Sequence, residues 1–198
     1  TSKSILIWRA MIQWLGGIGI IVIAIALFPI LKIGGMQLFQ SEFSSKEEKV
    51  LPRTKTIAAG IGVVYILLTI LCSLSLFLTG MTLFDSIAHG MTILATGGFS
   101  TKDMSIGYFD SLYTEIVVMI FMVVASIPFI YLFQAMKGKF SDLMNSSQVQ
   151  FFLLLIFISI IIVSFWLKRY YEVDFLQALR ISAFATISIS TGLSLIHI

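Results

Sequence analysis

The chain has 198 residues, of which 58% are hydrophobic and 12% are charged, and its formal net charge is +3. A soluble domain carries roughly 25% charged residues, so this composition excludes an ordinary soluble domain and predicts an integral membrane protein. Uncharged runs of about 20 residues predict membrane-spanning α-helices, because barrel strands would alternate over ~10 residues. The small positive charge is typical of the loops of a membrane protein, and no nucleic-acid partner is expected.

The first apolar segment covers residues 5–31 and is long enough to span a membrane as one helix. Its centre, residues 16–19 (Gly-Gly-Ile-Gly), would let another helix approach closely, because glycine has no side chain. Arg9 and Gln13 are four residues apart and therefore share one side of the helix. We expect them to meet polar groups of the protein, such as the back of a turn at membrane depth.

Three later segments are also long enough to span: residues 57–78, 112–136 and 149–167. Pro128 lies inside segment 112–136 and is expected to kink that helix, since proline removes one backbone hydrogen bond. Glu115 lies near one end of the same segment, where we expect it to be solvated.

Two further apolar segments, residues 81–95 and 175–189, are too short or too broken to span. Each follows a full span, begins with a helix-capping signal and ends in a Thr-Gly pair. The capping residues are Thr82 with Asp85 and, in the second copy, Asp174 with Gln177. The two copies share this organisation without matching residue by residue, and they differ in length by about one helical turn.

The Thr-Gly turns predict a cation pathway. Non-helical backbone at membrane depth is tolerated only where protein buries it or where it lines a water-filled cavity. Glycine permits positive φ, so successive carbonyls can point one way, and a ring of such carbonyls can replace the hydration shell of a cation. The partly negative C-terminal end of a half-helix favours cations as well. The candidate filter residues are Ala95, Thr96, Gly97 and Gly98 in the first copy and Ser190, Thr191 and Gly192 in the second.

An ordinary extracellular turn after an interfacial helix is the alternative interpretation of Thr96-Gly97-Gly98, because Gly-Gly with hydroxyl residues is common in turns. The second copy favours the filter. For His89 we expect a packed side chain, and for Arg180 a snorkelling or paired one. Asp85 could attract cations at an entrance, but its spacing from Thr82 indicates a helix cap. The sequence shows no metal-ligand cluster, nucleotide loop or nucleophile–base pair, so we expect neither catalysis nor a cofactor, and no metal beyond a transported potassium ion.

Loop charge predicts the orientation. Residues 32–55 carry five cationic side chains, whereas residues 79–113 contain one, Lys102. The first loop is therefore expected in the cytoplasm and the Thr96 turn outside. Lys168-Arg169 would then lie outside, against this trend.

Several separated motifs resemble one known family. Residues 8–19 (WRAMIQWLGGIG) and 34–39 (GGMQLF) resemble the membrane subunit of bacterial Trk potassium-uptake systems, in the Trk/Ktr/HKT superfamily. Residues 83–89 (LFDSIAH) with 95–101 (ATGGFST) are similar to its second pore loop, and residues 178–184 (ALRISAF) with 190–192 (STG) resemble the start of its third.

The resemblance implies an all-α membrane fold of four helix–pore loop–helix repeats around one pore, as in potassium channels. It further implies carbonyl-based potassium selection near one glycine per repeat, a homodimer in the lipid of the bacterial inner membrane, and a cytosolic nucleotide-binding regulatory subunit. By this alignment residues 5–31 are the exit helix of repeat one, and residues 57–136 are repeat two with pore loop 81–101. Residues 149–192 are the first helix and the pore helix of repeat three.

Residues 193–198 (LSLIHI) depart from the family pattern and are expected to be a non-native tail, so the chain is interpreted as an internal fragment. Two of four pore loops cannot close a ring, and this chain alone is not expected to conduct selectively. Two other functions stay open. An ion-coupled transporter with broken helices would need an intramembrane carboxylate, whereas Asp85 and Glu115 lie near helix ends. A non-transporting scaffold would use its short helices only to cover a bundle.

Overall fold

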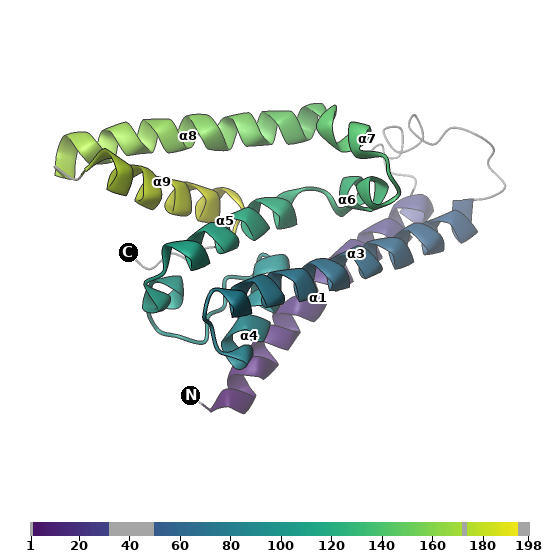
Figure 1. Cartoon of the computed structure of the whole chain (residues 1–198). Coiled ribbons are helices and arrows are strands. Elements are labelled where there is room, and N and C mark those ends of the chain that lie inside the picture. Colours follow the sequence, from purple (N-terminus) through teal and green to yellow (C-terminus); the bar gives the residue numbers. More distant parts are fainter. Residues whose placement is uncertain (1, 32–49, 172–173, 194–198) are drawn as a thin grey trace.

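The computed structural model describes residues 2–31, 50–171 and 174–193, and the regular elements there are all helical (Figure 1). Their bounds are α1 (Lys3–Leu31), α3 (Val50–Leu78), α4 (Leu83–Leu94), a 3-10 helix η2 (Ser105–Phe109), α5 (Leu112–Ser126), α6 (Phe129–Met136), α7 (Phe140–Met144), α8 (Ser147–Tyr171) and α9 (Phe175–Ser190). Side chains are described for residues 2–19, 57–171 and 174–193. The predicted all-α fold is confirmed. The motif at 34–39, most of the cationic first loop and the tail from residue 194 lie outside the described residues.

Two helices with described side chains are long and apolar enough to cross a membrane: α8, and α3 over residues 57–78. A third span is present if α5 and α6 are taken together. Helix α1 has 29 residues, which at 1.5 Å per residue gives about 43 Å, more than the ~30 Å hydrocarbon core of a bilayer. These elements match the positions of the four predicted spans.

The third predicted span is interrupted at Pro128. Helix α5 ends at Ser126, Ile127 is extended with φ −74° and ψ 135°, and the axes of α5 and α6 meet at 99°. Proline disfavours helical backbone in the residue before it and lacks an N–H for the helix, which explains the end of α5. The predicted kink at Pro128 is confirmed, and it is a full break between two helices: the sequence located the break but not its size.

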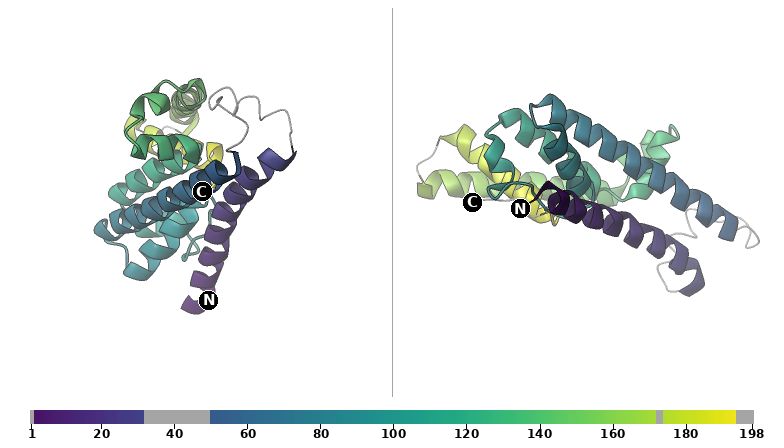
Figure 2. Two further views of the ribbon diagram at one scale, coloured as in Figure 1. Left: turned by 90° about the vertical axis from the view of Figure 1, so that its right-hand side faces the viewer. Right: turned by 90° about the horizontal axis from the view of Figure 1, so that it is seen from below.

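Both short helices fold back against the long helix that precedes them. Helix α4 contacts α3 and α1, while α9 contacts α8 and α5 (Figures 1 and 2). The lengths of α4 and α9 are 12 and 16 residues, so the predicted difference of one helical turn is confirmed. A core of buried side chains joins α3, α4 and α5, and it includes Tyr65, Leu76, Ile93, Leu94 and Met122.

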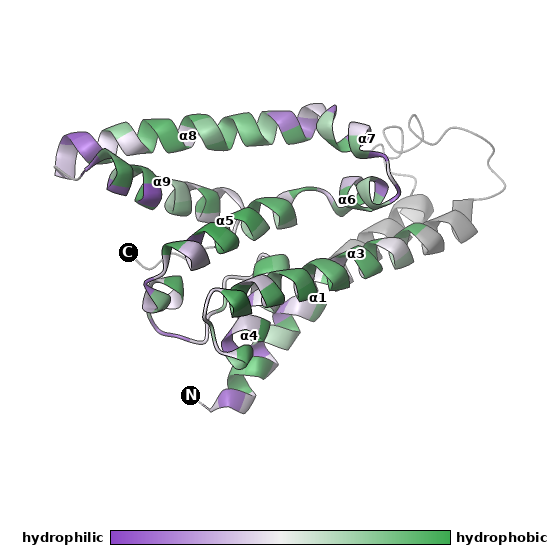
Figure 3. Ribbon diagram, viewed as in Figure 1, coloured by the Kyte–Doolittle hydropathy of each residue, from purple (hydrophilic) through white to green (hydrophobic). Residues whose placement is uncertain are grey.

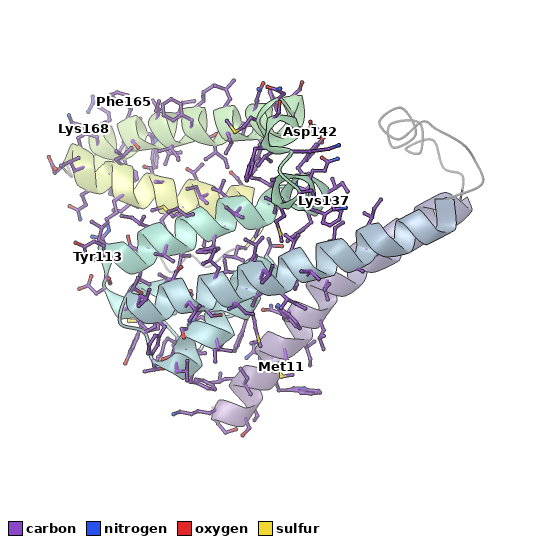
Figure 4. All side chains as sticks on the ribbon, turned by 45° about the vertical axis from the view of Figure 1, so that its right-hand side comes forward. Met11, Tyr113, Lys137, Asp142, Phe165 and Lys168 are labelled. Atoms are coloured by element: carbon purple, nitrogen blue, oxygen red, sulfur yellow. The ribbon has the colours of Figure 1, made fainter. Side chains whose placement is uncertain are left out.

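The described residues of α3 and α8 are mostly apolar (Figure 3), and many of their apolar side chains are exposed. On α3 the exposed side chains include Val63, Ile66, Leu67, Ile70, Leu71 and Leu74, and on α8 they include Phe151, Leu154, Phe157, Ile162 and Phe165. Met11 on α1 and Phe165 on α8 mark two such surfaces in Figure 4. Continuous exposed apolar surface is what lipid or further membrane helices cover, in keeping with an integral membrane protein.

Candidate cation-filter segment

The candidate filter segment, residues 95–98, begins where α4 ends. The N–H of Thr96 donates to the carbonyl of Ile93 at 3.1 Å, and the N–H of Gly97 donates to the carbonyl of Thr92 at 2.9 Å. This pair of bonds is the Schellman motif, in which the residue after the C-cap is left-handed. That residue is Thr96, with φ +49°, and Gly98 follows with φ +69°. Gly97 itself does not have positive φ, so the left-handed residues of this turn are Thr96 and the second glycine, Gly98.

A β-branched residue in the left-handed region is strained, by about 1–2 kcal/mol. We therefore expect Thr96→Gly to raise the free energy of unfolding of the detergent-solubilised chain by about 0.5–1 kcal/mol, after the extra flexibility of glycine in the unfolded state is subtracted. Thr191→Gly is the matched control, because Thr191 follows the other short helix with φ −87° and has no such strain to lose. Equal effects of the two substitutions on thermal unfolding would contradict this account.

Residues 99–101 return along one face of α4. Thr92, His89 and Asp85 lie on that face at helical spacing, and their partners follow in the reverse order along the chain. The contacts are Thr92 Oγ1 donating to the Phe99 carbonyl at 2.9 Å, His89 Nε2 with Ser100 Oγ at 2.9 Å, and Thr101 Oγ1 donating to Asp85 Oδ1 at 2.5 Å. The chain therefore enters as a helix and returns beside it as irregular backbone, which is the form of a re-entrant loop.

Asp85 fixes the far end of this loop. The hydroxyl of Thr82, the N-cap of α4, accepts from the N–H of Asp85 at 3.2 Å and donates to its Oδ2 at 2.8 Å. Lys102 Nζ lies 3.7 Å from the same carboxylate, whose side chain is buried. Burial by itself would raise the pKa of Asp85, but the hydrogen bonds from Thr101 and Thr82 and the charge of Lys102 outweigh it and place the pKa below its ordinary value. Asp85 is thus an internal anchor and not an exposed charge at an entrance.

His89 is fully buried and packs edge-on against Phe109. Its Nδ1 lies 2.8 Å from the carbonyl of Asp85, which can only accept, so Nδ1 carries the proton. Burial lowers the pKa of His89, and the neutral ring then accepts from the Ser100 hydroxyl through Nε2. The packed histidine that the sequence predicted is what the structure contains.

Helix α1 covers the other side of the candidate filter segment. Gln13 Nε2 donates to the carbonyl of Gly97 at 2.7 Å, and the Arg9 guanidinium lies 4.4 Å from the centre of the Phe99 ring. One turn beyond Gln13, a Cβ on Gly17 would lie 3.1 Å from the Ala95 Cα. Residues 9, 13 and 17 form one stripe of α1, so the turn lies between α1 and α4. Gln13 meets a polar group at the back of the turn, as expected, whereas Arg9 meets the aromatic ring of Phe99.

A hydrogen-bonded contact between α1 and α3 holds this stripe in place. Trp14 Nε1 donates to Thr69 Oγ1 at 3.0 Å, and the Tyr65 hydroxyl donates to the carbonyl of Trp14 at 3.0 Å. Thr69 Oγ1 in turn donates to the Tyr65 carbonyl at 2.7 Å. Sequence reasoning missed Tyr65 and Thr69 because they lie in an uncharged span. Their spacing of four residues, which places two hydroxyls on one helix face, was the available signal.

The second turn differs from the first by one position. The C-cap of α9 is Thr191, and the left-handed residue after it is Gly192, with φ +73°. In the first copy the left-handed residue is Thr96, so the two Thr-Gly pairs do not occupy equivalent places. At the start of α9, Asp174 is the N-cap and accepts from the N–H of Leu176 at 3.3 Å. No hydrogen bond joins the two turns within the described part of the chain.

An ion pair links the second half-helix, α9, to α5. Arg180 on α9 donates through Nε and Nη2 to the two carboxylate oxygens of Glu115 on α5, each at 2.7 Å. The expectation that Glu115 is simply solvated was wrong, because its side chain is 17% exposed and paired. We expected Arg180 to be either snorkelling or paired, and it is paired.

For this pair we expect a coupling free energy of about 1 kcal/mol in a double-mutant cycle of Glu115→Gln and Arg180→Met. Arg180→Lys should lose part of this stabilisation, since lysine cannot form the two-pronged contact. Thermal unfolding of the four variants in detergent measures the coupling. Additive effects of the two substitutions would show that the ion pair contributes nothing.

Comparison with known proteins supports the same architecture. The chain is 38% identical over 194 residues to the Trk system potassium uptake protein TrkH of Halomonas elongata, covering 96% of this chain and 40% of that protein. Against the protein of the same name from Escherichia coli K12 it is 43% identical over 138 residues, which are 69% of this chain and 29% of the relative. The crystal structure of the potassium transporter TrkH from Vibrio parahaemolyticus matches with a TM-score of 0.80 at 30% identity, covering 96% of this chain and 38% of that one.

The chain thus spans less than half the length of the relatives that it matches. The sequence model of the TrkH family, described as "Cation transport protein", matches residues 1–165. With the helical arrangement shared with the Vibrio structure, this match shows that the chain belongs to the TrkH cation-transport family of integral membrane proteins.

Proposed function

We propose that this segment supplies two of the pore loops of a potassium-selective, channel-like pathway. In this proposal Ala95–Gly98 and Ser190–Gly192 present backbone carbonyls to potassium, apart from the Gly97 carbonyl, which accepts from Gln13. Helices α4 and α9 are the pore helices behind these segments. Residues 5–31 are the exit helix of repeat one, 57–136 are repeat two, and 149–192 begin repeat three. The observation that carries the proposal is the Thr96-Gly97-Gly98 turn, held between α1 and α4 at the end of a half-helix.

The chemistry of this turn suits a cation. It is rich in main-chain carbonyls, and the C-terminal end of α4 adds partial negative charge at the same place. Carbonyl oxygens can replace water around potassium, and conduction requires that the ion bind weakly enough to leave again. Positive φ at Thr96 and Gly98 lets the chain reverse without a longer loop. Passive movement of potassium is thereby favoured over coupled exchange.

Asp85 and Glu115, the two carboxylates considered for ion coupling, argue against an ion-coupled transporter. Such a protein needs a carboxylate free to take up the coupling ion inside the membrane. Asp85 is occupied by two threonines and Lys102, and Glu115 is occupied by Arg180. Both carboxylates therefore stabilise the fold. A scaffold without transport predicts no dependence of ion uptake on the filter turn.

The assembly follows the family resemblance. We propose that the complete transport subunit forms a homodimer in the inner membrane and is regulated by a cytosolic nucleotide-binding subunit. These partners stay predictions, as does the alignment of the pore-loop repeats.

A chimera tests the proposed function. The part of Halomonas elongata TrkH that matches this chain is replaced by residues 1–193, and the chimera is produced in cells that lack their own potassium uptake. We expect growth at low potassium and a strong preference for potassium over sodium in uptake measurements. Equal uptake of the two ions by a chimera present in normal amounts in the membrane would overturn the proposal.

A further inference from the structure

We propose that Gln13 is a positioning residue of the filter: its side-chain amide fixes the peptide group of Gly97 and thereby the direction of the neighbouring carbonyls. This inference rests on the proposed function, since it concerns the same turn. Gln13 lies on α1, outside the re-entrant loop, and its Nε2 donates to the Gly97 carbonyl at 2.7 Å. The contact joins residues 84 positions apart in the chain.

The filter turn needs such a restraint. Gly97 and Gly98 have no Cβ, so their torsions are weakly limited by local sterics. The Gly97 N–H is held from α4 by the carbonyl of Thr92 at 2.9 Å, and Gln13 holds the carbonyl of the same residue from α1. Because a peptide group is planar, fixing this carbonyl also fixes the plane that contains the nitrogen of Gly98. Helix α4 thus fixes the orientation of the peptide group before the Gly97 Cα, and α1 fixes the one after it.

The surroundings of Gln13 match this role. A Cβ on Gly97 would lie 2.6 Å from the Gln13 Cδ, so glycine leaves the room that the amide occupies. Arg9 against Phe99 and Gly17 against Ala95 set the register of α1 on either side of Gln13. The direction of the amide follows from its chemistry, since the reversed amide would place two acceptor oxygens against each other.

Stability alone does not explain a glutamine at this position. Its Oε1 is buried and has no hydrogen-bond partner among the described residues. A buried acceptor without a partner destabilises a fold, whereas an unbranched apolar side chain of similar size would avoid that cost. The amide is therefore useful for the hydrogen bond that its Nε2 donates, which holds the Gly97 peptide of the candidate filter.

The test uses the chimera described above with Gln13→Met and Gln13→Glu. Methionine is close in size and cannot donate, and glutamate donates only when it is protonated. The measurement is the ratio of potassium to sodium uptake at about pH 7.5 and at about pH 5, on either side of the range in which a partly buried glutamate titrates. The charged and titratable groups of the packed elements include Lys3 and Arg9 on α1, Tyr65 on α3, Asp85 and His89 on α4, and Lys102 after the candidate filter. Any effect of their titration on the uptake ratio is corrected for by measuring the unsubstituted chimera at each pH.

We expect Gln13→Met to lower the ratio by about three- to tenfold at both pH values, the size of one net hydrogen bond. Gln13→Glu should lower it at least as much at the higher pH and recover most of it at the lower pH. A merely structural role would lower the amount of protein without a recovery that depends on pH. Met11→Leu, on the exposed surface of α1, is the control and should leave the ratio unchanged.

A ratio that stays within about twofold of the unsubstituted chimera for Gln13→Met, or no recovery of Gln13→Glu at low pH, overturns the inference. The methionine variant keeps the test decisive if the glutamate variant does not insert, because an apolar residue favours insertion. Failure of the proposed function is distinguishable, since the unsubstituted chimera would then itself not prefer potassium.

Discussion

Gly97→Ala in the chimera is expected to abolish most of the preference for potassium over sodium, or to abolish uptake. The new Cβ would lie 2.6 Å from the Gln13 amide carbon and oxygen, which is closer than packed atoms approach. The flexible end of Gln13 can move away, so the fold survives, but the 2.7 Å bond to the Gly97 carbonyl is lost. The filter peptide then loses its restraint from α1. Ion-uptake ratios measured per amount of protein in the membrane check this result.

Gly107→Ala is the matched control for that substitution. Gly107 follows in the same loop, within η2, and a Cβ there would have no heavy atom within 4 Å. Its φ is not positive, so alanine adopts the same backbone without strain. We expect the control to transport as the unsubstituted chimera does. If Gly97→Ala behaved in the same way, a scaffold would explain the molecule better than a filter.

Gly16→Ala and Gly17→Ala are expected to change stability in opposite directions although the two glycines are neighbours. At Gly17 a Cβ would lie 2.9 Å from the Tyr65 hydroxyl and 3.1 Å from the Ala95 Cα. The Ala95 atom is main chain, so α1 must shift, and overpacking of this kind costs about 1–3 kcal/mol. At Gly16 the Cβ meets no heavy atom within 4 Å. Alanine there should stabilise the helix by about 0.5–1 kcal/mol.

Thermal unfolding of the detergent-solubilised chain measures both glycine variants. In the chimera, Gly17→Ala should also impair uptake, because it moves α1 and therefore Gln13 away from the filter turn. Gly16→Ala should leave uptake intact. Stabilisation by both substitutions would show that α1 does not pack on Ala95 as described.

Much of this molecule follows from local properties of its sequence. Apolar runs located α1, α3 and α8, because the length of an uncharged run sets whether a helix can span lipid. The capping residues Thr82 and Asp174 marked the first turns of the two short helices, since an N-cap satisfies N–H groups only a few residues away. Helical spacing also placed Arg9 and Gln13 on a common face.

Other features depend on contacts that no local pattern encodes. Glu115 and Arg180 are 65 residues apart, and they are paired only because α9 packs on α5. The bend of 99° at Pro128 is set by what α6 packs against as well as by the proline. Thr96 takes a left-handed conformation that its side chain disfavours, so bonds to Ile93 and Thr92 hold it there.

By itself the sequence determined the all-helical membrane class, the order of long and short helices, and the place of the Thr-Gly turns. The tertiary structure decided which side chains support those turns. The physical reason is that every residue has a carbonyl. The sequence around residue 97 therefore cannot indicate which side chain donates to the Gly97 oxygen. Only the packing of α1 against α4 brings Gln13 to it.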